Sequence, residues 1–148
     1  MPKDQGIGAA SKRREDVRFV TGAGQYTDDI NRPGQVYCQF LRSDVAHGRI
    51  VSLDASAAES APGVGGVFTA KHLQGAGGVP CGWQVTDKNG EPMKEPKHPI
   101  LAEGKVRHVG DPIVAIIAES LEAARDAAEL VELEIEDLPA VVDMRAAL

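Results

Sequence analysis

The pattern of apolar and polar positions is clearest in the last third of the chain. Residues 113–118, IVAIIA, form a continuous apolar run, which predicts a strand buried on both faces. A helix capped by Ser120 follows, and its small apolar positions recur at helical spacing: Leu121, Ala124, Ala128 and Val131. Residues 130–136 then alternate, so we expect their glutamates to face solvent. This region is expected to fold as strand–helix–strand.

The middle of the chain carries a second set of strands. Residues 35–42 alternate, with Val36, Cys38 and Phe40 on one face. Tyr37 and Leu41 indicate that the other face is partly covered too. We therefore expect Cys38 to be a small buried hydrophobic residue. After a loop, residues 49–53 are expected to form the next strand.

Turn and cap residues divide the rest of this middle region. Asp54 is expected to cap a short helix that ends at residues 62–63, Pro-Gly, and residues 64–69 then return as a strand. Thr69 is expected to cap a further turn, and residues 105–108 read as a short edge strand. Together these elements predict an α+β fold in which a mixed β-sheet carries two or more packed helices.

Two segments lack any clear period. Residues 1–34 are expected to form an extended N-terminal arm, of which the first twelve residues are loose, and residues 35–148 are expected to form one folded domain. Within that domain, residues 74–99 are rich in Gly and Pro and predict a long loop that is functional, packed on a partner or disordered. Because neither residues 13–35 nor the loop builds an apolar face, we expect both to contact other protein.

Composition narrows the classes of function. Of the 148 residues, 43% are hydrophobic but only 4% are aromatic, so the core must come from Val, Ile, Leu and Ala. The formal net charge is −6, and residues 119–143 hold nine acids against Arg125 alone. Because an acidic surface repels phosphate backbones, we expect no nucleic-acid partner.

The cysteines and the apolar runs bear on the cellular compartment. Cys38 and Cys81 lie far apart and offer neither a disulfide framework nor zinc-ligand spacing. The first twenty residues contain no apolar run of the kind found in secretory signals, and no window approaches the length of a membrane span. We therefore expect a cytoplasmic protein.

Several residues invite a functional reading, each with a plainer alternative. Gly22-Ala23-Gly24 lacks the third glycine of a dinucleotide loop, because position 27 is Thr, and a tight turn is expected instead. Asp28 and Asp29 are adjacent, so on an extended chain they point to opposite faces and form no acid–base pair by themselves. We expect them to pair with arginines or to cap a turn.

The histidines and Lys94 could also indicate a function. No two histidines stand three or four residues apart, so no metal site is expected among His47, His72, His98 and His108. Met93-Lys94 is similar to the modified lysine of biotin carriers, which sits in a hairpin turn between two methionines, but Glu95 replaces the second methionine. A biotin- or lipoyl-like carrier domain therefore stays open as a third hypothesis.

Five segments in order carry a resemblance to a known family: REDVRFVTGAGQYTDDI (14–30), LRSDVAHGRIVSLD (41–54), APGVGGVFTA (61–70), KVRHVGDPIVAIIAES (105–120) and ELVELEIEDLPAVVD (129–143). They resemble the N-terminal part of the large, molybdopterin-binding subunits of the molybdenum hydroxylases. That family includes xanthine dehydrogenase, aldehyde oxidase and aerobic carbon monoxide dehydrogenase. In it, this region forms the α/β hammerhead domain.

The resemblance implies an oxidoreductase whose molybdenum is held by molybdopterin and whose electrons pass to iron–sulfur and flavin subunits. The family's cofactor loops and its general base lie downstream of the hammerhead, so we assign no catalytic, cofactor-binding or metal-binding residue here. We expect no bound cofactor and no activity from this chain alone, and a role at interfaces with the cofactor-binding domains and partner subunits. The alternative is a stand-alone scaffold or binding subunit of a split-gene complex. Asp143, which reads as the cap of a further helix, favours a longer chain.

Overall fold

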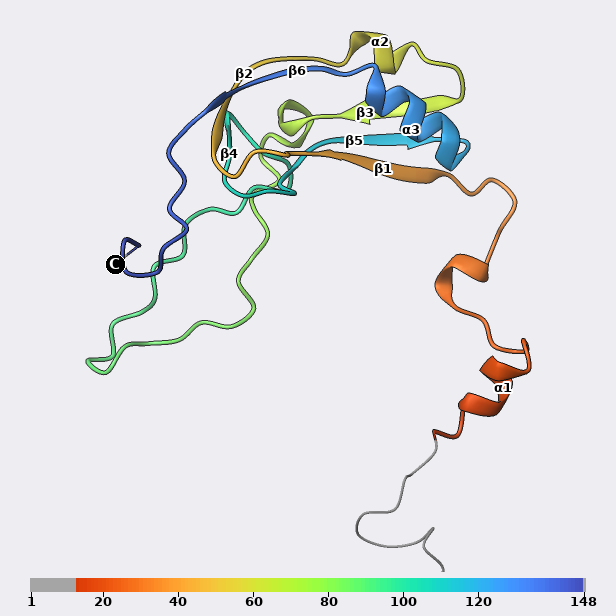
Figure 1. The fold of residues 1–148 in the computed structure, drawn as a ribbon, viewed down its shortest axis with the longest axis horizontal. Helices are drawn as coiled ribbons and strands as arrows, with labels where there is room; N and C mark the ends of the chain where they lie inside the picture. The colour runs from red at the N-terminus through yellow and green to blue at the C-terminus, as the bar shows by residue number, and fades with distance from the viewer. Residues whose placement is uncertain (1–12, 148) are drawn as a thin grey trace, which may run out of the picture. The chain divides into compact units, whose positions relative to one another are not determined.

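The structure is a computed structural model that describes residues 13–147, so the loose segment predicted for residues 1–12 lies outside the described residues. The chain divides into two units between Gln35 and Val36. In the first unit, the described elements are α1 (Asp16–Val20) and the 3₁₀ helix η1 (Thr27–Asp29). The second unit contains β1 (Tyr37–Arg42), β2 (Gly48–Asp54), α2 (Ser56–Glu59), β3 (Val64–Phe68), η2 (Ala70–Leu73), β4 (Lys105–Val106), β5 (Pro112–Ala118), α3 (Leu121–Glu129) and β6 (Glu132–Asp137) (Figure 1).

The first unit differs from the extended segment that the sequence predicted, because a short helix forms in it. Arg13 Nε lies 2.9 Å from Asp16 Oδ1 at the start of α1. At the other end, Gly22 adopts a φ of +74°. The Gly22 N–H donates to Phe19 O at 3.1 Å, and the Ala23 N–H donates to the carbonyl of Arg18 at 2.8 Å. This is the Schellman pattern, in which a left-handed glycine satisfies the last carbonyls of a helix.

The second unit is built on two three-stranded sheets, with strand orders β1-β5-β3 and β4-β2-β6. Every pair of neighbouring strands in them is antiparallel. The predicted α+β class is therefore confirmed, and the division of the strands between two sheets is a detail that the hydrophobic pattern did not contain. Both sheets are assembled from strands that are distant in sequence, since β1 pairs with β5 and β2 with β6.

The core draws on both sheets and on the α3 side of β5. Its largest fully buried side chains are Val106 of β4 and Ile113, Val114 and Ile116 of β5. The helix α3 packs on β1 and β5 through alanines. Its fully buried positions are Ala124, which belongs to the predicted stripe, and Ala127, which does not. Because alanine side chains are small, the helix backbone can approach the sheet closely. Leu133 and Ile135 of β6 add to this core, while the intervening glutamates are exposed.

Strand β1 is covered on the face of Tyr37 and Leu41 and open on the face of Cys38. Tyr37, Gln39 and Leu41 are half-buried, whereas Cys38 and Phe40 are exposed. The prediction that Cys38 is buried was therefore wrong. Both faces of this strand carry apolar residues, so alternation alone cannot tell which face is inside. Contact with α3 decides it, because the helix covers the other face of the sheet.

The central strand β5 is also less covered than its sequence predicts. Val114, Ile116 and Ala118 are fully buried, but Ala115 and Ile117 between them are only partly buried. These two side chains point to the face opposite α3. The helix α3 contacts β1, β3 and β5, and Figure 1 shows it on one side of the sheet only.

Caps fix the ends of the short elements. Asp54 Oδ1 accepts a hydrogen bond from the Ser56 N–H at 2.9 Å, and this bond holds the pKa of Asp54 below its ordinary value. The Thr69 N–H donates to His72 Nδ1 at 3.0 Å in the predicted turn. Asp143 Oδ1 accepts from the Arg145 N–H at 2.7 Å, and residues 144–147 form a turn.

The cap of α3 gives a first prediction. Ser120 Oγ accepts a hydrogen bond from the Ala123 N–H at 3.1 Å, as the sequence predicted. Replacing Ser120 by Ala leaves this amide unpaired, so we expect the free energy of unfolding to fall by about 1 kcal/mol. Urea denaturation of the 148-residue chain measures the change. S120D, which keeps an acceptor, should restore most of the loss, and equal stability of S120A and the parent chain would contradict the assignment.

Candidate functional site

The glycine turn at residues 22–24 follows a helix, whereas a dinucleotide-binding loop must precede one. Gly24 lies against the ring of Phe19, and a β-carbon at Gly24 would overlap that ring. The glycines therefore serve the end of α1 and its packing. Asp29 Oδ2 accepts a hydrogen bond from the Tyr26 N–H at 2.8 Å, which is a turn cap.

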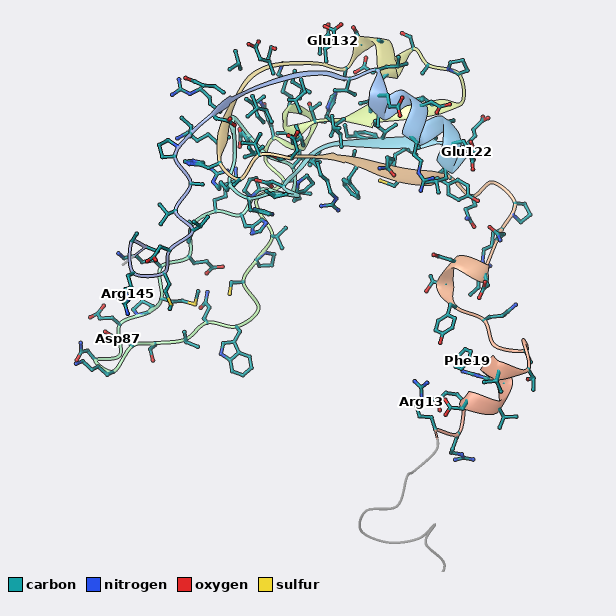
Figure 2. All side chains as sticks on the ribbon, viewed as in Figure 1. Arg13, Phe19, Asp87, Glu122, Glu132 and Arg145 are labelled. Carbon is teal, nitrogen blue, oxygen red and sulfur yellow. The ribbon has the colours of Figure 1, made fainter. Side chains whose placement is uncertain are left out.

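The first unit, residues 13–35 of the described chain, has an exposed apolar surface around a small aromatic cluster. The rings of Phe19 and Tyr26 stack with their centroids 4.8 Å apart, and the Arg18 guanidinium lies 5.0 Å from the Phe19 centroid. Val17 is 69% and Val20 is 83% exposed, and no residue of α1 is buried. Figure 2 shows Phe19 on this short helix. The unit contains no core of its own that could cover these side chains.

The loop at residues 74–99 is held at its base and exposed along its length. The Val79 N–H donates to His98 O at 2.7 Å, which joins the two ends of the loop. Gly78 is required there, because a β-carbon at this position would lie 2.7 Å from that carbonyl oxygen. Further out, the Met93 N–H donates to Val85 O at 3.0 Å. Trp83 in this loop is 79% exposed.

The carboxylate of Asp87, labelled in Figure 2, holds a turn at the far end of the loop. Asp87 Oδ1 accepts from the Asn89 N–H at 2.7 Å and from the Glu91 N–H at 2.9 Å. The bond from Glu91, followed by that from Asn89, holds the pKa of Asp87 below its ordinary value.

The depressed pKa of Asp87 predicts a local response to acid. The ionised carboxylate stabilises the turn above the ordinary pKa of Asp, about 3.9, and this contribution is lost as the pH falls through the lower folded value. NMR titration should show the Asn89 and Glu91 amide protons shifting together below about pH 3.9. D87N should remove that titration. An Asp87 that titrates at or above its ordinary value would contradict the hydrogen-bond pattern.

Lys94 does not occupy the position that a carrier lysine would need. It is exposed, but it follows the hairpin formed around the Thr86–Pro92 bridge, whose tip is the Asp87 turn. The geometry that suggested a carrier domain, a lysine at a hairpin turn, is therefore absent at this residue.

The four histidines do not come together at one site, although His98 and His108 are neighbours. His47 Nδ1 lies 2.8 Å from Pro139 O and can donate to it, which ties the chain after β6 to the loop before β2. The rings of His98 and His108 meet edge to face, 6.4 Å between centroids, beside a cavity of about 210 Å³. His108 Nδ1 is 3.9 Å from the buried Asp111, which also accepts the Arg107 N–H. Residues 13–147 contain no group of three or more His, Cys, Asp or Glu placed to hold a metal ion.

The cavities of the described residues do not form a cradle for molybdopterin. One of them, about 570 Å³, is an open depression lined in part by His47, Arg107 and His108. A large polar cofactor needs several converging donors, and in residues 13–147 every buried side-chain nitrogen or oxygen already has a partner within the protein. We therefore derive no chemical step through a cofactor held by these residues.

Comparison with known proteins decides the family. Residues 21–139 match the family described as "Aldehyde oxidase and xanthine dehydrogenase, a/b hammerhead domain". The chain belongs to this family. The hammerhead domain is 42% identical over 145 residues to the 6-hydroxypseudooxynicotine dehydrogenase complex subunit gamma of Paenarthrobacter nicotinovorans, a match that covers 96% of this chain and 18% of the relative.

Two further similarities agree with this assignment. The hammerhead domain is 34% identical over 137 residues to the xanthine dehydrogenase molybdenum-binding subunit of Escherichia coli O157:H7, covering 92% of this chain and 18% of that subunit. The crystal structure of quinoline 2-oxidoreductase from Pseudomonas putida 86 superposes with a TM-score of 0.82 at 35% identity, covering 97% of this chain and 18% of that one. The resemblance predicted from the sequence is confirmed.

The hammerhead domain corresponds to only a part of each of these relatives. It spans about 18% of the length of these relatives.

No helix in the part of the chain that the structure describes has the length and apolar content to cross a membrane.

Proposed function

We propose that the chain is the hammerhead domain of a molybdopterin-dependent hydroxylase and acts as a structural part of its large subunit. The observation that carries this proposal is the family match over residues 21–139, in a chain that spans about 18% of its relatives. In this proposal the molybdopterin is held by the remaining 80% or so of the large subunit, and the hammerhead domain itself binds none.

The proposed partners are of two kinds. The first is the cofactor-binding remainder of the large subunit, and the second is the pair of iron–sulfur and flavin subunits that carry electrons away. A relative named as a subunit of a dehydrogenase complex supports an assembly of this type. The exposed apolar side chains of the first unit and of the loop at residues 74–99 supply contact surface that the domain leaves uncovered, such as Val20 and Trp83.

Deletion of residues 13–35 from the full-length large subunit tests this role. We expect assembly to fail or weaken, with loss of bound molybdenum and of dye-linked dehydrogenase activity, because exposed Val17 and Val20 would no longer contact their partner. The matched control is R14A in the same segment, which changes a charged, exposed residue and should leave molybdenum content unchanged. Unchanged assembly and activity after the deletion would refute the interface role of this segment.

The isolated 148-residue chain provides the second half of the test. We expect it to contain no molybdenum and to show no dye-linked dehydrogenase activity, since no described cavity supplies the donors for the cofactor. Metal analysis of the purified chain and an activity assay measure this. Stoichiometric pterin, or turnover by the chain alone, would overturn the proposal.

A further inference from the structure

The side of the β1-β5-β3 sheet that faces away from α3 is an uncovered apolar surface. We call it the outer face, and it consists of Val36, Cys38, Phe40, Gly66, Phe68, Ala115 and Ile117. Strand register places these residues in two rows across the sheet, because partners directly opposite each other share a face. Phe40 and Phe68 both pair with Ala115, and Cys38 and Gly66 both pair with Ile117.

The side chains of the outer face are apolar and open to solvent. Phe40 is 38%, Phe68 43% and Val36 56% exposed, and Cys38 is exposed as a free thiol. The Phe68 ring lies close to Gly66, where the missing side chain leaves space for it. No acid or base lies among these residues. Contiguous apolar surface of this kind marks a place where other protein binds.

The rim of the outer face is polar. The Arg42 guanidinium lies 5.2 Å from the Phe40 centroid, and its Nη1 donates to Gly110 O at 2.9 Å. The His72 ring meets Phe68 edge to face at 5.9 Å. An apolar centre with Arg42 and His72 at its edge is the arrangement found in protein interfaces, which have a hydrophobic centre and a polar rim.

The sequence of β5 indicates that the outer face is covered in the complete protein. Residues 113–118 are continuously apolar, which is the pattern of a strand buried on both sides. On the α3 side, Val114, Ile116 and Ala118 are fully buried, whereas on the other side Ile113 is buried but Ala115 and Ile117 are only partly buried. The exposed side of β6 shows the contrast, because it carries glutamates that suit solvent: Glu132, Glu134 and Glu136.

We propose that the outer face is the docking surface for the cofactor-binding remainder of the large subunit, an inference that rests on the proposed function. The relatives are more than five times as long as this chain, so most of a large subunit is polypeptide that this chain does not contain. Permanent contacts are more apolar than those between separable subunits. An uncharged face centred on two phenylalanines therefore fits the remainder of the same subunit better than the iron–sulfur or flavin subunits.

The reactivity of the Cys38 thiol reports whether this surface is covered. In the variant C81S, Cys38 is the only thiol of the chain, and in C38S the exposed Cys81 of the loop is the only one. We expect Cys38 to react with a maleimide as fast as Cys81 in the isolated chain. In the full-length large subunit, with its other cysteines followed separately by peptide mass spectrometry, we expect Cys38 to react at least about tenfold more slowly.

The labelling rates also distinguish other occupants of the outer face. Protection of Cys38 in the isolated chain would mean that a second copy or the chain's own first unit covers the face, and protection that appears only after the iron–sulfur and flavin subunits are added would assign it to them. Either result overturns the inference. Labelling of Cys38 at the isolated-chain rate in an active, molybdenum-loaded large subunit would overturn it too, while leaving the proposed function intact.

Substitutions give an independent readout of binding. The chain is co-expressed with the cofactor-binding remainder as two polypeptides, and F40A and F68A are expected to reduce co-purification roughly tenfold or more. V51A changes an exposed strand residue of the other sheet and should leave it unchanged. Equal recovery of F40A, F68A and V51A would contradict the docking surface. The intact-subunit labelling decides the question if the separated pieces do not associate.

Discussion

Replacing Ile116 by Ala should lower the free energy of unfolding of the 148-residue chain by about 3 kcal/mol. Ile116 is fully buried in the central strand β5, between β1 and β3. Removing three carbons there loses their burial and leaves a cavity, because strands on both sides hold the backbone in place. A loss of this size is a large part of the total stability of a domain this small, so partial unfolding at 37 °C is expected.

Ile117 provides the matched control for this prediction. It is the same residue type, one position along the same strand, but its side chain lies on the outer face and is partly exposed. I117A should therefore cost only about 1 kcal/mol in the isolated chain. Urea denaturation followed by circular dichroism measures both variants. Equal losses would mean that the two faces of β5 are equally covered, which contradicts the burial found here.

The second large effect is expected at Gly48, where an alanine should destabilise the chain by about 2 kcal/mol. Gly48 is buried in β2 and pairs with Val106 of β4 on one side and with Asp137 of β6 on the other. A β-carbon there would overlap the side chain of Ile135 and would lie 3.1 Å from Glu136 O. The side chain can move but the backbone carbonyl cannot, so the sheet must shift.

The variant G65A is the control for G48A. It shows how much a Gly-to-Ala change alters stability when the added β-carbon meets no close neighbour. Gly65 lies in β3, it is exposed, and a β-carbon there would meet Ile117 O at an ordinary 3.7 Å. G65A should change stability by no more than about 0.5 kcal/mol. Thermal unfolding of G48A and G65A side by side measures the difference. A G48A variant as stable as G65A would show that the core around Ile135 has space that the structure does not show.

The elements of the fold could be predicted because each has a local signature. Ser120 has both the residue type and the position of a helix cap, and residues 130–136 alternate strictly, so α3 and β6 were expected close to where they lie. The division into two sheets depends instead on pairing between residues far apart, such as Cys38 with Ile117, and no local pattern encodes it. The short helix α1 was missed because five residues are too few to show a helical period.

The alternation in β1 likewise did not reveal which face of the strand is left uncovered in this chain. Both faces of β1 carry apolar side chains, since Tyr37 and Leu41 alternate with Cys38 and Phe40. The sequence indicated that Cys38 is buried and that the face of Tyr37 and Leu41 is partly covered, but α3 covers only the second of these faces. A strand with two apolar faces and a single covering layer is the signal that would have identified the outer face.

The hydrogen bond between Val79 and His98 has a consequence for how this protein can diverge. It closes residues 79–98 into a loop whose two ends are joined by this hydrogen bond. The sheets therefore do not depend on the sequence inside the loop. Doubling the length of such a loop adds only about 0.6 kcal/mol of closure entropy. Insertions, deletions and wholesale exchange of this segment are therefore tolerated by the scaffold.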